Sequence, residues 1–171
     1  EQDLEQAVKW YAAAAEQGNA PGMCCLGFMY ESGRGVKQSW ETAVDWYKRA
    51  AEKGYPRALC NLAWCYEHGE GVQQDYGEAV RLYRAAADQE YPRGQLCLGL
   101  CYERGRGVPM DKAAAAEWYR KAAEQGDEDG ACCLGFMYEC GEGVEQSWES
   151  AAEWYKRAAA GGLSRGMCNL A

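Results

Sequence analysis

Apolar residues recur along the chain at the spacing of a single buried helix face. Between residues 20 and 32 they fall at i, i+3, i+4 and i+7, through Met23, Leu26, Gly27 and Tyr30. This pattern predicts an amphipathic helix, named helix A here, with one buried stripe. A second helix, helix B, is predicted by the stripe through Ala43, Val44, Tyr47, Ala50 and Ala51. Together the two stripes predict a helix hairpin.

The hairpin pattern returns with a period of 36 residues, as Gly-x-Gly pairs at Gly33/Gly35, Gly69/Gly71, Gly105/Gly107 and Gly141/Gly143 show. A fixed period of this length is typical of repeat architectures in which one unit is stacked many times. The predicted fold is all-α: a right-handed α/α superhelix (solenoid) of stacked antiparallel helix hairpins with a 36-residue period.

One solenoid domain is expected over residues 1–171. Residues 1–18 are predicted as helix B of a preceding repeat, followed by full repeats at 19–54, 55–90, 91–126 and 127–162 and the start of a further helix A at 163–171. Solenoids normally finish with atypical polar caps. A chain that begins on helix B and ends on helix A is therefore expected to be a fragment of a longer array.

Signals for the ends of helix B recur in phase with the repeat. Short oxygen side chains that cap helix N-termini stand at Asp3, Ser39, Asp75, Asp111 and Ser147, and capping-box spacings at Asp3/Gln6 and Asp75/Glu78. Glycines that favour a helix stop follow at Gly18, Gly54, Gly126 and Gly162. Only Glu90 departs from glycine at this phase.

The charge balance narrows the choice of partners. The chain has 18 Lys and Arg against 26 Asp and Glu, a formal net charge of −8. A negative chain repels phosphate backbones, so nucleic acid is not expected as a partner. No apolar run reaches the length of a membrane span, so no membrane insertion is expected.

The whole pattern resembles one family. Residues 20–54 read A-x-x-x-x-x-L-G-x-x-Y-x-x-G-x-G-V-x-x-[DS]-x-x-x-A-x-x-W-Y-x-x-A-A-x-x-G, and later repeats return this motif with small changes. The motif resembles the Sel-one-like repeat (SLR) family, relatives of the tetratricopeptide repeats. The resemblance implies a non-enzymatic adaptor that binds a protein or peptide, as family members do in signalling, in protein quality control at the endoplasmic reticulum and in bacterial contact with host cells.

Ten cysteines stand almost wholly in helix A, at Cys24, Cys25, Cys60, Cys65, Cys97, Cys101, Cys132, Cys133, Cys140 and Cys168. Packed helices lie about 8–10 Å apart, farther than the ~7 Å Cα separation that a disulfide allows. The family's cysteine-rich branch clamps helix A to helix B at two phases that hold Met23 and Ala51 here. We therefore expect mostly buried thiols and a lean towards a reducing, cytoplasmic compartment.

The sequence also allows two alternatives to a binding scaffold. The first is a metal- or redox-responsive thiol site. Cys65 and His68 lie on one stripe of a helix A, and the same stripe in the next repeat carries Cys97 and Cys101. A hydrolase acting on β-lactam-like compounds is implied only by the cysteine-rich branch of the family. With one histidine and no orienting third group, no catalytic residue is predicted, and no cofactor is expected.

The expected binding surface is the concave groove lined by A helices, at the phases of residues 21, 24, 28, 31 and 32, which tetratricopeptide-like relatives use for ligands. A large apolar rung is formed by Phe28, Trp64, Leu100 and Phe136, and an acidic rung by Glu31, Glu67, Glu103 and Glu139. Arg57, Arg93, His68 and Arg104 complete the predicted site. These rungs predict a ligand with apolar and basic residues. The alternative is that the apolar rung fills space between helices and the glutamates are solvated.

Overall fold

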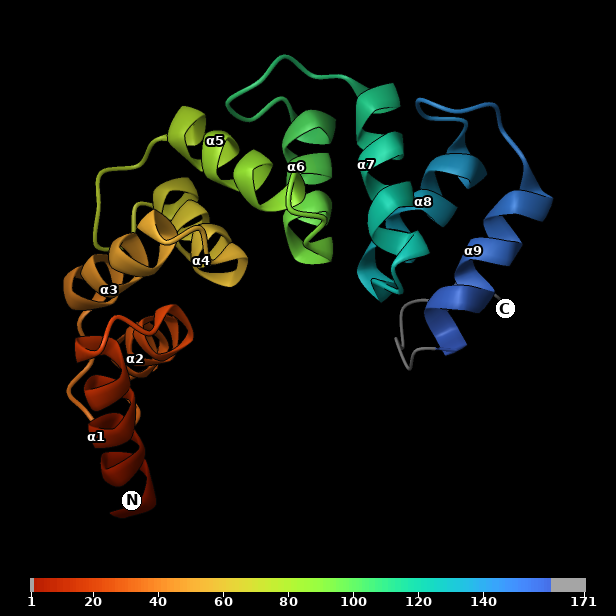
Figure 1. Cartoon of the computed structure of the whole chain (residues 1–171). Coiled ribbons are helices and arrows are strands. Elements are labelled where there is room, and N and C mark those ends of the chain that lie inside the picture. The colour runs from red at the N-terminus through yellow and green to blue at the C-terminus, as the bar shows by residue number, and fades with distance from the viewer. Residues whose placement is uncertain (1, 161–171) are drawn as a thin grey trace. The chain divides into compact units, whose positions relative to one another are not determined.

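The computed structural model describes residues 2–160, except the side chain of Gln2, and over this range it contains helices and no strand (Figure 1). The helices are α1 (Gln2–Glu16), α2 (Ala20–Ser32), α3 (Trp40–Glu52), α4 (Pro56–His68), α5 (Tyr76–Ala87), α6 (Pro92–Arg104), α7 (Lys112–Glu124), α8 (Glu128–Cys140) and α9 (Trp148–Ala160). The predicted alternation of helices A and B is confirmed. Gly162, Cys168 and the further helix A expected at 163–171 lie outside the described residues.

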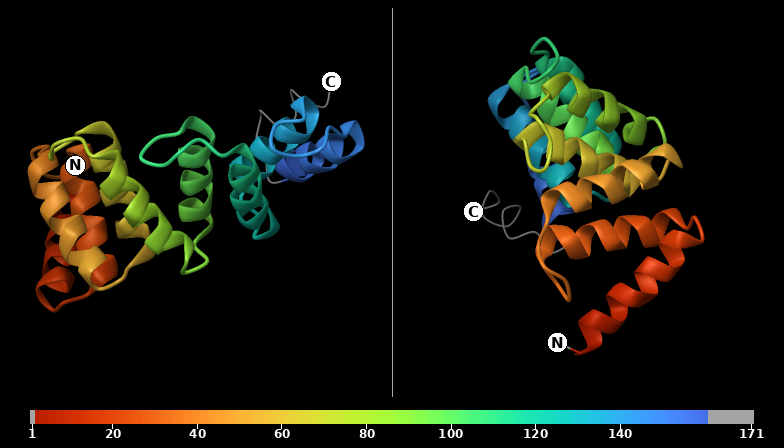
Figure 2. Two further views of the ribbon diagram at one scale, coloured as in Figure 1. Left: turned by 90° about the horizontal axis from the view of Figure 1, so that it is seen from above. Right: turned by 90° about the vertical axis from the view of Figure 1, so that its left-hand side faces the viewer.

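The chain divides into two compact units, residues 1–86 and 87–171. In the first unit α1 packs on α2, α2 on α3 and α3 on α4, and in the second α6 packs on α7, α7 on α8 and α8 on α9. Figure 2 shows α1 and α2 joined by a short loop in a V-shaped hairpin. Each unit is thus built from consecutive helices that pack as hairpins, as the sequence period predicts. None of the helices described is both long and apolar enough to span a bilayer.

Helix A ends where the first glycine of each Gly-x-Gly pair takes a left-handed backbone conformation. Gly105, with φ of 65°, donates its N–H to the carbonyl oxygen of Cys101, and Gly33, Gly69 and Gly141 end α2, α4 and α8 in the same way. Glycine adopts this conformation without the Cβ penalty of other residues. The repeated glycine therefore sets the length of helix A.

Helix B begins at most of the predicted caps. Ser39, Asp75, Asp111 and Ser147 accept hydrogen bonds from the backbone N–H three residues on, which confirms these four. The cap predicted at Asp3, with its box to Gln6, is wrong, because α1 is already helical at Gln2.

The capping box predicted between Asp75 and Glu78 is only half formed. Asp75 accepts from the Glu78 N–H, but the Glu78 carboxylate binds Arg81 instead of reaching back. The N–H of Asp75 donates to the carbonyl oxygen of Tyr66. The Arg81 guanidinium thus takes the Glu78 carboxylate, and the Tyr66 carbonyl takes the Asp75 N–H, which in a full capping box would bind each other.

The core of each hairpin is a buried tyrosine of helix B lying over a small residue of helix A. Tyr47, Tyr83, Tyr119 and Tyr155 are at most 2% exposed. A Cβ added at Gly99 would lie 2.6 Å from the Tyr119 ring, and Gly27 and Gly135 are equally close to Tyr47 and Tyr155. The Leu-Gly step of the motif is therefore needed for close packing of the ring.

Candidate protein-binding surface

The apolar rung is partly exposed in the structure. The Trp64 side chain is 37% exposed and Phe136 46% exposed, whereas Phe28 and Leu100 are half-buried. Leu100 packs against the core cluster around Tyr119, and the Arg34 guanidinium lies 5.7 Å from the Phe28 ring centroid. The rung thus combines two positions open to a ligand with two that contribute more to packing.

Trp64 stands in the middle of a three-ring stack in the first unit. Its ring centroid lies 5.5 Å from that of Trp40 and 4.2 Å from that of His68, with nearly parallel planes in both pairs. His68 is further held by its Nδ1, which donates to the Trp64 carbonyl oxygen over 2.9 Å. Stacked aromatic pairs are stabilised by about 0.5–1.5 kcal/mol beyond the area they bury. The stack joins the start of α3 to the end of α4 and leaves Trp64 and His68 exposed.

The acidic rung is tied into the fold. Glu31, Glu67, Glu103 and Glu139 each accept a hydrogen bond from the tyrosine hydroxyl sixteen residues later, in helix B of the same repeat. Burial first, and the neighbouring Glu103 among other charges, raise the pKa of Tyr119 far above its ordinary value. The glutamates are half-buried, and each has a structural role in its repeat in addition to its place on the candidate binding surface.

A glutamine that the sequence reasoning missed recurs beside the acidic rung. The side-chain amides of Gln38, Gln74 and Gln146 donate over 2.8 Å to the backbone carbonyl oxygens of Glu31, Glu67 and Glu139, respectively. Their recurrence in phase with the repeat was the signal that would have revealed them. In the third repeat the same phase holds Met110, which is 65% exposed.

One phase expected in the groove belongs to the core. Cys24, Cys60, Leu96 and Cys132 are all buried, with exposures of 1% to 6%, so this part of the prediction is wrong. Arg57, Arg93, Arg104 and His68 are exposed. The candidate surface is therefore narrower than predicted: it keeps Phe28, Trp64, Leu100, Phe136, the four glutamates and these four basic residues.

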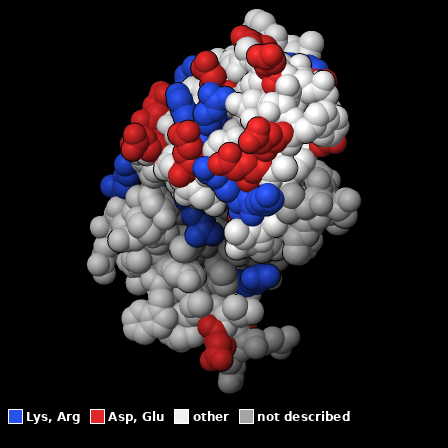
Figure 3. All heavy atoms as spheres, turned by 90° about the vertical axis from the view of Figure 1, so that its right-hand side faces the viewer, with Lys and Arg blue, Asp and Glu red and all other residues white. Residues whose placement is uncertain are grey.

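Charged side chains of both signs lie close together on one face of the molecule. In the part of that face that Figure 3 colours, Lys and Arg are interspersed with Asp and Glu. Ion pairs such as Lys112 with Glu142, 2.7 Å apart, join neighbouring residues. Exposed pairs of this kind contribute little to stability, so they leave the aromatic rungs as the more distinctive feature.

Nothing within residues 2–160 supports the alternative thiol or metal site. The nine within the described residues are present as thiols, and no group of three or more His, Cys, Asp or Glu side chains in that range is arranged to hold a metal ion. Cys65 is fully buried whereas His68 is exposed, so the two face different environments. Burial raises the pKa of the Cys65 thiol to about 12, which disfavours the reactive thiolate.

Fold and surface together define an all-α repeat protein built from stacked antiparallel helix hairpins. The Sel1 repeat family matches residues 1–19, 20–55, 56–91, 92–127 and 130–163, so the chain belongs to the Sel1 repeat family. Proteins of this family are generally protein-interaction scaffolds and are typically non-enzymatic.

Solved structures agree with this assignment. The chain is 44% identical to c5321, a protective antigen of uropathogenic Escherichia coli strains with an SLR fold, at a TM-score of 0.90 over 98% of this chain and 36% of that one. It is 36% identical to a Sel1 repeat protein from Oxalobacter formigenes, with a TM-score of 0.91 over 97% of this chain and 66% of that one.

The cysteine-rich branch is more distant. Identity to Helicobacter pylori cysteine rich protein B is 26%, with a TM-score of 0.61 over 72% of this chain and 94% of that one. A search of curated protein sequences returned no match. The chain spans about a third of the length of the Escherichia coli antigen and about two thirds of the Oxalobacter protein.

Proposed function

We propose that this chain is a non-enzymatic scaffold that binds a peptide or protein segment along the exposed rungs of its A helices. The observation that carries the proposal is the stack of Trp40, Trp64 and His68, in which the exposed rings of Trp64 and His68 pack on each other and on Trp40. Rigid aromatic side chains lose little conformational entropy on binding and dominate the energetics of many interfaces.

The acidic rung supports a ligand with basic residues. In Glu31, Glu103 and Glu139 the tyrosine hydroxyl occupies Oε2, and Oε1 makes no further hydrogen bond within the described residues. Each carboxylate is therefore held in place with one oxygen still able to accept from a Lys or Arg of the ligand. Such preorganisation lowers the entropic cost of binding.

The experiment is affinity capture from the source cell with a paired set of variants. Trp64→Ala combined with Phe136→Ala removes the two most exposed rungs, one in each unit. Trp10→Ala removes a tryptophan that is 68% exposed but lies on α1, a helix B. Circular dichroism establishes that all three proteins keep their helices.

We expect the Trp10→Ala protein to capture the same partner as the parent and the double variant to lose at least tenfold in affinity, as is usual when aromatic interface anchors are truncated. Equal capture by the double variant, with its helicity intact, would refute the proposal. Loss of helicity in the double variant would assign the rungs to the core and refute it as well.

A further inference from the structure

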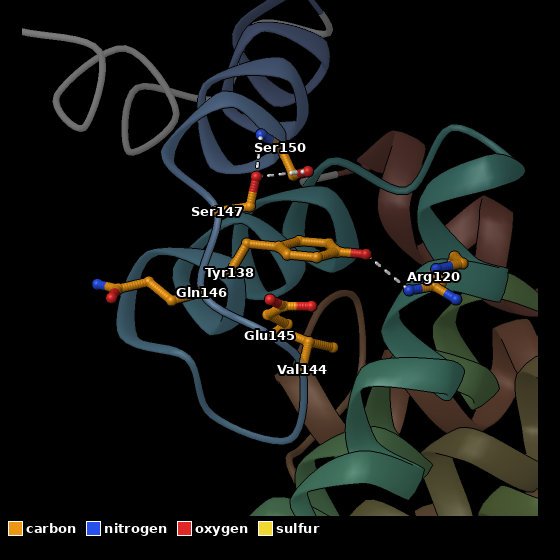
Figure 4. Close-up of a pocket in the computed structure, with 7 residues that line it drawn as sticks. All are labelled: Arg120, Tyr138, Val144, Glu145, Gln146, Ser147 and Ser150. Atoms are coloured by element: carbon orange, nitrogen blue, oxygen red, sulfur yellow. Dashed lines mark hydrogen bonds between the residues drawn. The ribbon is translucent and has the colours of Figure 1, made fainter.

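A second concave site lies in the second unit, at the loop side of the fourth repeat. A pocket of about 600 Å³ is lined by Arg120, Tyr138, Val144, Glu145, Gln146, Ser147 and Ser150. Figure 4 shows Arg120 reaching in from α7, the Tyr138 ring of α8 forming one wall, and the two serines above it at the start of α9. The pocket thus draws residues from three helices and the Gly-x-Gly-Val loop.

This pocket is separate from the proposed binding rungs. Tyr138 stands two residues after Phe136 on α8, and two residues turn a helix by about 200°. The two side chains therefore leave α8 on opposite faces. A ligand in the pocket and a segment on the rung use different surfaces of the same helix.

The chemistry of the pocket centres on a cation that has no anionic partner among residues 2–160. The half-buried Arg120 donates to the Tyr138 hydroxyl oxygen over 2.8 Å and makes no ion pair with any residue between 2 and 160. A guanidinium has five N–H donors, so most remain unused. Glu145 lines the same pocket without pairing with Arg120.

Tyr138 adds a matching donor. Because its oxygen accepts from Arg120, its own hydrogen is left to donate. Ser147 and Ser150, whose hydroxyls are 3.0 Å apart, extend the polar wall, and Val144 supplies an apolar contact. A planar guanidinium beside a phenol hydroxyl matches the two oxygens of a carboxylate.

We infer that this pocket binds a carboxylate group, held by the Arg120 guanidinium and the Tyr138 hydroxyl. A doubly charged phosphate fits less well, because Glu145 places a like charge in the pocket and the chain carries a net charge of −8. The carboxylate can come from a free small acid or from an Asp or Glu side chain of a peptide.

The first unit contains a matched comparison. An equivalent pocket of about 400 Å³ is lined by Tyr66, Val72, Gln73, Gln74 and Asp75. It keeps the tyrosine and the valine, but the phase of Ser147 holds Asp75, and no Lys or Arg lines it. The phase of Arg120 holds Lys48, which lines a different pocket. With Asp75 in its lining, this pocket is expected to bind anions more weakly than the pocket at Arg120.

The test is a nuclear magnetic resonance titration of the full chain, following the amide signals of Ser147 and Ser150 and the Nε–H of Arg120. Four probes are compared: acetate, N-acetyl-glutamate methylamide, its neutral glutamine counterpart and inorganic phosphate. Arg120→Gln removes the cation, and Arg157→Gln removes an exposed arginine of α9 that pairs with Glu153 outside the pocket.

We expect the titration to give a dissociation constant at least tenfold lower for the glutamate probe than for the glutamine probe. Arg120→Gln should raise the dissociation constant of the glutamate probe at least tenfold, whereas Arg157→Gln should leave it unchanged. If acetate binds as tightly as the glutamate probe, the site is assigned to small acids. If the glutamate probe binds more tightly than acetate, the site is assigned to peptides. Phosphate binding tighter than both, shifts retained in Arg120→Gln, or equal shifts around Asp75 would overturn the inference.

Discussion

The hydroxyl of Tyr119 donates a hydrogen bond of 2.9 Å to a carboxylate oxygen of Glu103, and so joins helix B to helix A within one repeat. The tyrosine is fully buried over Gly99, while the glutamate stands on the candidate binding surface. The same arrangement recurs in the other described repeats. The core of each hairpin is therefore linked directly to the position of one acidic rung residue.

Replacing Tyr119 by Phe is expected to destabilise the chain by about 1–2 kcal/mol, because a hydrogen bond to a charged group is lost while the ring packing is kept. Urea unfolding measures the change. The control is a cycle with Glu103→Met, which has no oxygen to accept from the hydroxyl, and in which the two residues should show coupling. Strictly additive effects of the two substitutions would mean that the hydrogen bond contributes nothing to stability.

The sequence period was enough to predict the helices, because the buried stripe and the helix-ending glycines are local signals. The phase of Cys24 was misjudged because a cysteine is compatible with either a surface or a core position, and only packing against helix B decides between them. The bond from Tyr47 to Glu31 was not predicted because it joins residues of two helices, and its partner looked like an ordinary exposed acid. The cap at Asp3 failed because α1 begins before it.

Glu90 offers a direct test of backbone strain. It is the one non-glycine described residue with positive φ, at 58°, and stands where the other repeats have Gly54 and Gly126. A left-handed conformation costs an ordinary residue about 1–2 kcal/mol, partly offset by the extra chain entropy of glycine. Glu90→Gly is therefore expected to raise the free energy of unfolding by about 1 kcal/mol.

The matched control for Glu90 is Gly126→Ala, since a Cβ there meets no atom within 4 Å. Its effect comes from backbone conformation alone, and it should lower stability by a similar amount. Thermal or urea unfolding of both variants provides the comparison. If Glu90→Gly is destabilising, a side-chain contribution of Glu90 must outweigh the strain.

The buried thiols make stability depend on alkaline pH. Burial, and then the nearby Glu31 and Glu70, raise the pKa of Cys65 from 9.0 to about 12. Since the unfolded chain loses this proton first, the contribution is complete below about pH 9 and is lost as the pH rises towards 12. Each such group adds a slope approaching 1.4 kcal/mol per pH unit.

Cys65→Met places at this phase the residue found in two other repeats, Met29 and Met137. Between about pH 9 and pH 12, where the slope from this thiol approaches ~1.4 kcal/mol per pH unit, the variant should lose stability less steeply than the parent. Urea unfolding at several pH values gives the two slopes. Parallel slopes would show that Cys65 is not protected from ionisation by the fold.

Thiol reactivity should separate the cysteines by exposure. Cys140 is exposed at the end of α8, whereas Cys24 and Cys65 are at most 1% exposed, and burial raises the pKa of Cys24 to about 12. A disulfide-exchange reagent at neutral pH is expected to modify Cys140 rapidly and the two buried thiols only when the fold opens. Cys140→Ser should remove one equivalent from the fast phase, and peptide mapping identifies the remainder. If Cys65 instead reacts as fast as Cys140 in the folded protein, it is an accessible thiolate. That result would favour the metal- or redox-responsive function, against which the burial of Cys65 argues.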